Sequence, residues 1–373
     1  MGILNSTMNR LCHHATARTL FLSFCFCAFL PFYAQTSTTP YQPGITTDGA
    51  IYMLPKTAIR VTVRSVKRTY TPGDFCKYAQ RYLRLNNVSI EPSVVHELIS
   101  VTQTPIGIAD STKAFAVKFD ARTVAANVAL SDDGTLLAIN AAPKTSLTTL
   151  FTPFTPAVKK ERKDPHQFLN EEILAAGSTA KMAELTAQEI YDLRESRSLL
   201  IKGQADFMPK DGEQLRLMLS QLSEQDEALT SLFSGIVECD TTEQSFLVVP
   251  NLPIRNRVVF RFSSHFGVVA ADDLSGAPYS ISVERLSDIP DMAPDNGKKK
   301  KLNPKGIYVN VPSKMRSTLF SGNDIIDTSE MPAPQFGYVE LLSDQLFNKR
   351  YTTHLWLNPV SGAVDKLEAE QPK

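Results

Sequence analysis

Cysteine is scarce in this chain, and most of it lies near the N-terminus. Three of the five cysteines occur up to Cys27, so only Cys76 and Cys239 remain beyond the leader described below. Two cysteines cannot build the disulfide framework of a small secreted domain. They allow one disulfide, Cys76–Cys239, and two separate free thiols are the alternative.

Patterns that carry well-known chemistries are also missing. The sequence has no glycine-rich phosphate loop, no dinucleotide-binding fingerprint and no Gly-x-Ser-x-Gly nucleophile elbow. His96 and Glu97 begin a zinc-protease pattern, but Ser100 stands where the second histidine is needed. We therefore expect no cofactor and no metal ion.

Neither sign of charge dominates. Beyond residue 34 the chain has 37 basic and 39 acidic residues, a net charge of −2. The one basic run, Lys298–Lys301, is typical of a solvated loop. This balance gives no electrostatic reason to expect a nucleic-acid partner.

The first 34 residues resemble a secretory signal peptide. A basic lead-in precedes an apolar run from Leu20 to Phe32, and Ala34 is a suitable last residue before cleavage. Lipidation at Cys25 or Cys27 is an alternative, although a bulky phenylalanine precedes each. The run is short for a membrane helix, and no later segment approaches spanning length. We expect an exported protein of the periplasm or cell envelope, without a transmembrane segment once the signal is removed.

Residues 164–235 have the pattern of three consecutive helices. The first is expected from the Asp164 cap to Gly177, the second from Thr186 to Gly203, and the third from Asp211 to Gly235. The third has a wide apolar stripe that includes Leu215, Met218, Leu219, Leu222, Leu229, Leu232 and Phe233. Polar residues on all three predict helices that lie on another layer.

Strand patterns flank this helical segment. Ile59, Val61 and Val63 alternate with polar residues, and Asp133-Gly134 is a strong hairpin signal. Similar short strands separated by Pro and Gly continue after residue 236. We predict an α+β fold with two β-rich, sandwich-like portions around the helices. The expected division is a signal peptide (1–34), a linker (35–48), an N-terminal β-rich domain (49–163), the helical segment (164–235) and a C-terminal β-rich domain (236–373).

Several strings resemble an uncharacterised family of exported proteins from Gram-negative anaerobes, the domain of unknown function 4831. They include the stretches 51–57, 78–83, 177–184 and 194–197. The resemblance covers nearly all of the chain beyond the leader. It implies export and assigns no activity.

Ser178 and Lys181 form the sharpest catalytic candidate. Ser-x-x-Lys at a helix start is the nucleophile motif of penicillin-recognising enzymes, in which the lysine takes the serine proton. No Lys-Thr-Gly motif follows it in the chain. A helix cap with a solvated lysine is the simpler interpretation.

Two short strings, Asp110-Ser111-Thr112 and Asp240-Thr241-Thr242, resemble the acceptor pattern for O-linked glycans in exported proteins of such bacteria. They make Ser111 and Thr241 candidate attachment sites. The leading hypothesis is a non-catalytic envelope protein that binds another protein or a glycan. The alternative is a periplasmic serine hydrolase or acyltransferase with Ser178 as nucleophile and Lys181 as base.

Overall fold

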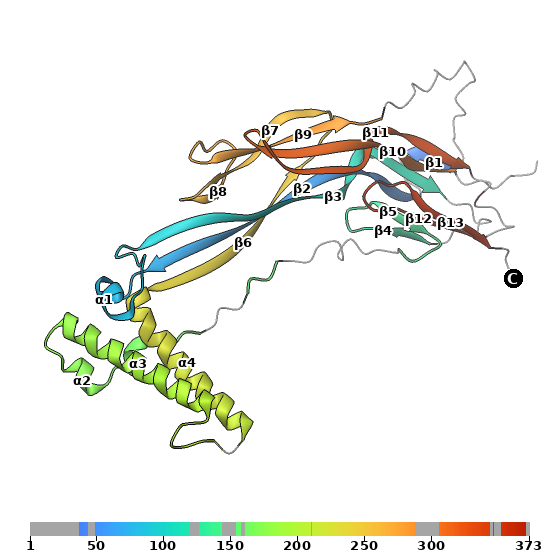
Figure 1. Ribbon diagram of the computed structural model, residues 1–373. Coiled ribbons are helices and arrows are strands. Elements are labelled where there is room, and N and C mark those ends of the chain that lie inside the picture. The colour runs from blue at the N-terminus through green and yellow to red at the C-terminus, as the bar shows by residue number, and fades with distance from the viewer. Residues whose placement is uncertain are drawn as a thin grey trace, which may run out of the picture. The chain divides into compact units, whose positions relative to one another are not determined.

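The computed structural model describes residues 37–43, 49–118, 127–143, 154–157, 161–209, 211–287, 306–343, 346 and 352–370. The expected signal peptide and the Lys298–Lys301 run lie outside these residues. Within them, the strands form three antiparallel sheets, and two long helices near the middle of the sequence lie at one end of the strands (Figure 1). The predicted α+β class, with β-rich portions on both sides of the helical stretch, is confirmed.

The first sheet is built on a long hairpin. β2 (Ala50–Thr71) and β3 (Ser93–Lys118) pair from one end to the other, and the strand order is β1-β3-β2-β6. The flanking strands are β1 (Ser37–Pro40) and β6 (Ile236–Val248). The predicted alternation in β2 is confirmed, because Ile59, Val61 and Val63 are fully buried.

The other two sheets follow the same antiparallel rule. The second has the order β11-β10-β9-β7-β8 and the third has the order β13-β12-β5-β4. Their strands are β4 (Val128–Leu130), β5 (Leu136–Ile139), β7 (Ile254–Ser263), β8 (Gly267–Val269), β9 (Ala277–Arg285), β10 (Gly306–Ser321), β11 (Asp324–Ser343), β12 (Thr352–Leu357) and β13 (Val364–Glu370). Strands from before and after the helical segment pair directly, since β6 lies beside β2 and β12 lies beside β5.

Three apolar clusters hold these layers together. The first joins β2 to the second sheet through residues such as Val61, Phe260 and Met315. Another joins the start of β2 to β10 and the third sheet through Leu54, Ile307, Leu355 and their neighbours. The last belongs to the helices. Burial of these side chains is the main favourable term for each layer contact.

The helices partly match the prediction. The third expected helix is α4 (Gly212–Ser234), with the Asp211 carboxylate as N-cap and Gly235 after its end, as predicted. The first is two short pieces, η3 (Pro165–Phe168) and α2 (Glu171–Leu174). The expected start of the second at Thr186 is wrong. α3 (Thr179–Lys202) begins two residues after Gly177, because the Ser178 hydroxyl caps it. Thr186 lies inside the helix, where its hydroxyl donates to the Met182 carbonyl.

Two local rules do not hold here: a strand is expected to stop at a proline, and an aspartate is a preferred helix N-cap. β2 does not stop at Pro55 but runs through it. Residues two apart in a strand direct their N–H groups to the same side. The Thr57 N–H donates to Gln335 Oε1 and not to β3, so the backbone nitrogen at position 55 also faces away from β3. A proline there costs no hydrogen bond of the β2–β3 ladder. Asp74 does not cap the short helix η1 (Cys76–Tyr78) and α1 (Ala79–Leu83), because Phe75 occupies the cap position. No helix in the described ranges is long and apolar enough to cross a membrane.

Candidate functional site

The helical segment is anchored at one end only. Its core contains Phe75, Ala183, Ile190, Leu229 and Phe233, which come from the start of α3, the end of α4 and the η1–α1 turn. Ala183, Ile190 and Phe233 are fully buried. The other halves of α3 and α4 extend beyond this core as a helical hairpin.

An ion pair fixes the two helices of the hairpin to each other. The Arg194 guanidinium donates to Asp226 Oδ1 at 3.0 Å and to Thr230 Oγ1 at 3.1 Å. These contacts link α3 with α4. The pairing lies about one helical turn from the core residues Ile190 and Leu229.

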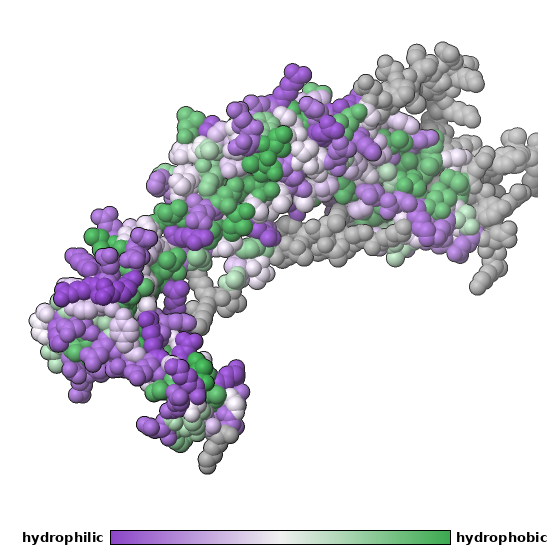
Figure 2. Space-filling view, viewed as in Figure 1, coloured by the Kyte–Doolittle hydropathy of each residue, from purple (hydrophilic) through white to green (hydrophobic). Residues whose placement is uncertain are grey.

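The far end of the hairpin exposes large apolar side chains. Phe207 is 66% exposed, Ile201 63%, Leu217 61% and Met208 38%. We call these four residues the hairpin tip. Figure 2 shows hydrophobic surface (green) at this end of the helices, among polar neighbours. Exposed neighbours of both charges, including Lys202 and Asp206, surround it.

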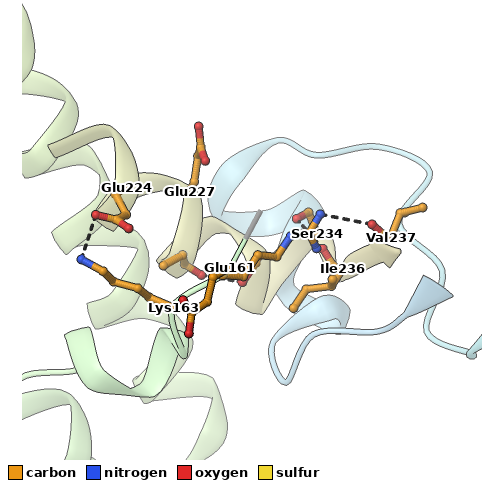
Figure 3. Close-up of a pocket in the computed structure, with 11 residues that line it drawn as sticks. Glu161, Lys163, Glu224, Glu227, Ser234, Ile236 and Val237 are labelled. Atoms are coloured by element: carbon orange, nitrogen blue, oxygen red, sulfur yellow. Dashed lines mark hydrogen bonds and ion pairs between the residues drawn. The ribbon is translucent and has the colours of Figure 1, made fainter. Parts of the chain in front are cut away.

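A groove lies where the other end of α4 meets the first sheet. The stretch 161–163 runs beside the last turns of α4 and encloses a space of about 400 Å³ with the start of β6 (Figure 3). The lining residues are Glu161, Arg162, Lys163, Glu224, Glu227, Ala228, Ser231, Ser234, Gly235, Ile236 and Val237.

Most polar contacts of this groove are internal. Lys163 Nζ pairs with Glu224 Oε2 at 2.9 Å, and Arg162 Nη2 donates to the Val237 carbonyl at 3.2 Å. Ser231 and Ser234 hydroxyls donate to main-chain carbonyls within the α4–β6 junction. These contacts fasten the segment before the helices to α4 and β6. The groove therefore has an evident structural role.

Comparison with known proteins adds the family. A model of the domain of unknown function DUF4831 matches residues 48–365. The chain belongs to this family. The resemblance of the four strings is thereby confirmed. No curated protein and no solved structure matches the chain.

Within the DUF4831 domain, Ser178 and Lys181 have the geometry of a helix cap. Ser178 Oγ accepts a hydrogen bond from the backbone N–H of Lys181 at 3.3 Å. Lys181 Nζ pairs with Glu184 Oε1 at 3.2 Å, and both side chains are about half exposed. An ammonium held by a carboxylate is a poor proton acceptor, so this arrangement favours the structural interpretation. The acyl-enzyme alternative stays a prediction.

The two cysteines are free thiols in the structure. Cys76 is half-buried in η1, and Cys239 is exposed on β6, opposite Arg68 of β2. Their disulfide stays a prediction.

The two predicted glycan sites differ in exposure and in strand pairing. Ser111 belongs to a three-residue excursion of β3, whereas Thr241 is half-buried in β6 and paired with Val66.

The zinc-like string lies in a strand and not in a helix. His96 and Glu97 are neighbours in β3, so their side chains point to opposite faces of the sheet. Among the described residues, no three His, Cys, Asp or Glu side chains gather as metal ligands would.

Sequence reasoning did not find the hairpin tip. Leu217 lies outside the apolar stripe of α4, and Ile201, near the end of α3, is mostly exposed. Phe207-Met208 in the short connection between Gly203 and Pro209 was the available signal, because such connections are usually polar.

Proposed function

We propose that this protein is an exported component of the cell envelope that binds another envelope protein and does not act as a catalyst. The observation that carries the proposal is the hairpin tip, where Ile201, Phe207, Met208 and Leu217 are exposed at the same end of the helical hairpin. Contiguous exposed apolar side chains bordered by polar ones are typical of protein interaction sites.

The hairpin tip is suited to a protein partner for energetic reasons. Full burial of a Leu, Ile, Phe or Met side chain contributes about 1.5–3 kcal/mol. Four side chains between 38% and 66% exposed therefore retain much of this free energy for a partner.

Export and binding are tested separately. Cell fractionation should find the protein in the envelope fraction, and N-terminal sequencing of that protein should find Gln35 as its first residue.

Cross-linked purification of the tagged protein from intact envelopes should recover one stoichiometric partner, which is lost when Leu217→Asp places a charge in the hairpin tip. Loss with the control Leu252→Asp, at a leucine that is 76% exposed, would show a general effect of surface charge. Recovery that is the same with Leu217→Asp and wild type would reject the hairpin tip as the binding surface.

A further inference from the structure

Strand register brings three connections of the second sheet to one end. Phe262 pairs with Ala277, Tyr279 pairs with Ser321, and Ser321 pairs with Asp324. The β7–β8 turn (264–266), the β8–β9 loop (270–276) and the β10–β11 turn with the first residues of β11 (322–326) must therefore lie together. We call these three connections the loop end.

The loop end exposes its own group of large apolar side chains. Leu274 is 80% exposed, Ile325 70%, Phe266 69% and Ile326 41%. Figure 2 shows hydrophobic surface (green) among the loops near β7 and β8. Each of the three connections supplies at least one of these residues. A single exposed leucine needs no explanation, but a group from three separate connections does.

The β8–β9 loop is braced and not merely exposed. Arg261 Nε donates to the Ala271 carbonyl at 3.0 Å and its Nη1 donates to the Gly276 carbonyl at 3.1 Å, so one side chain holds both ends of the loop. Asp273 Oδ1 accepts from Ser275 N–H at 2.9 Å and shapes the turn around Leu274. Leu274 is thus presented by a loop whose shape is already fixed.

The neighbouring turn is also anchored. The Ser264 carbonyl accepts a hydrogen bond from the backbone N–H of His96 in β3 at 2.7 Å, which fixes the β7–β8 turn to the first sheet. Preorganised loops lose little conformational entropy when a partner binds. Two of the three connections of the loop end therefore have the rigidity expected of a docking surface.

The charge of the loop end has one sign. Asp272, Asp273 and Asp324 are exposed, and neither 264–276 nor 321–326 contains a lysine or arginine. The guanidinium of Arg261 in β7 is directed to the two loop carbonyls. This differs from the hairpin tip, where both signs occur.

We propose that the loop end is a second docking surface, and that it takes a protein which presents an apolar site bordered by Lys or Arg side chains. The exposed Leu274, Ile325 and Phe266 would fill the apolar site, and the three aspartates would face the basic border. Complementary charge of this kind fixes orientation and speeds encounter. An anionic lipid surface is disfavoured, because it would meet three carboxylates. The proposal goes beyond the hairpin tip and does not depend on it.

The test places a photo-cross-linking amino acid at position 274 of the full-length protein in living cells, with position 252 as the matched control. Leu252 is 76% exposed but precedes β7, at the opposite end of the same strand. We expect a cross-link from position 274 alone, and the sequenced cross-linked peptide should contain apolar residues with Lys or Arg nearby. The triple change Asp272→Asn, Asp273→Asn and Asp324→Asn should reduce the yield by roughly tenfold.

Several results would overturn the proposal. These are a cross-link to a second copy of this chain or to phospholipid, an equal yield from position 252, and a yield that the three asparagines leave unchanged. All substituted side chains are exposed, and an unchanged urea midpoint would verify that each variant folds. Leu217→Asp should leave the position-274 cross-link intact, so failure of the hairpin proposal and failure of this one are distinguishable.

Discussion

The hydroxyl of Tyr52 is bonded to the main chain of Tyr308, 256 residues away. It accepts a hydrogen bond from Tyr308 N–H at 2.9 Å and donates to the Tyr308 carbonyl at 3.3 Å. Tyr52 is fully buried, and the Phe115 ring stacks on the Tyr308 ring at a centroid distance of 4.5 Å. Burial raises the pKa of the Tyr52 hydroxyl, which therefore stays protonated and able to donate. One side chain thus joins β2 to β10, on opposite sides of the helical segment in the sequence.

Removal of this hydroxyl should destabilise the protein. Tyr52→Phe leaves the Tyr308 N–H and carbonyl buried without that partner, which costs about 1–3 kcal/mol. Urea unfolding measures the loss as a lower midpoint. Tyr308→Phe is the matched control, since it keeps the main-chain groups that Tyr52 uses. If both variants lose equal stability, the hydrogen bonds of Tyr52 are not the reason.

Ser178→Ala separates the cap from the catalytic alternative. Loss of the hydroxyl that accepts from Lys181 N–H should cost about 1 kcal/mol and leave partner binding unchanged. Ser178→Asp, another good cap, should restore stability. Covalent labelling of the wild-type protein by an acylating probe, abolished in both variants, would instead support a serine nucleophile.

His166 should make the anchoring of the helical segment dependent on pH. Hydrogen bonds to the carboxylates of Asp164 and then Asp74 raise the pKa of His166 above its usual value. The charged imidazole is favoured in the folded state, so its contribution is complete below the ordinary pKa of about 6.5. It is lost as the pH rises through the raised pKa.

Nuclear magnetic resonance titration of the His166 ring measures this pKa directly. Unfolding at about pH 5.5 and about pH 8.5 should show a small stabilisation at the lower pH that His166→Gln removes. The effect is small because all three side chains are more than half exposed. A His166 pKa below that of an unfolded peptide would contradict the account.

The two predicted glycan sites should differ in use. Ser111 is exposed in the β3 excursion, whereas Thr241 is half-buried in a paired strand that an enzyme would have to reach. If the mature protein is modified, Ser111→Ala should remove the added mass and Thr241→Val should not. Intact-mass spectrometry of the envelope-purified protein, before and after chemical deglycosylation, decides this. An unmodified wild-type mass would remove both sites.

The sequence predicted correctly those helix ends and turns that interactions between nearby residues determine. Asp211 and Gly235 bound α4 because a capping carboxylate and a glycine with positive φ act on adjacent backbone. The Asp133-Gly134 turn between β4 and β5 follows for the same reason. In contrast, the start of α3 was predicted too late. Thr186 is followed by Glu189 at the capping-box position, whereas Ser178, which caps the helix in the structure, is followed by Lys181.

Long-range pairing could not be predicted in this way. Nothing local to Pro55 shows that β2 continues through it, since this depends on Gln335 from β11 taking the hydrogen bond of Thr57. The pairing of β6 with β2 likewise depends on contacts across about 180 residues. The hairpin tip and the loop end are groupings of residues that the tertiary structure creates, so periodicity within one segment does not reveal them.

The most direct test of the binding proposal is a quantitative cross-linked purification from intact envelopes with three tagged proteins: wild type, the double variant Ile201→Asp and Leu217→Asp, and Leu252→Asp. Mass spectrometry would measure the amount of partner per tagged chain. We predict one partner near a one-to-one ratio for wild type and Leu252→Asp, and at least about a tenfold loss for the double variant, because its two apolar contacts contribute more than 1.4 kcal/mol. Equal recovery from all three proteins, or no partner above background from wild type, would contradict a binding role for the hairpin tip.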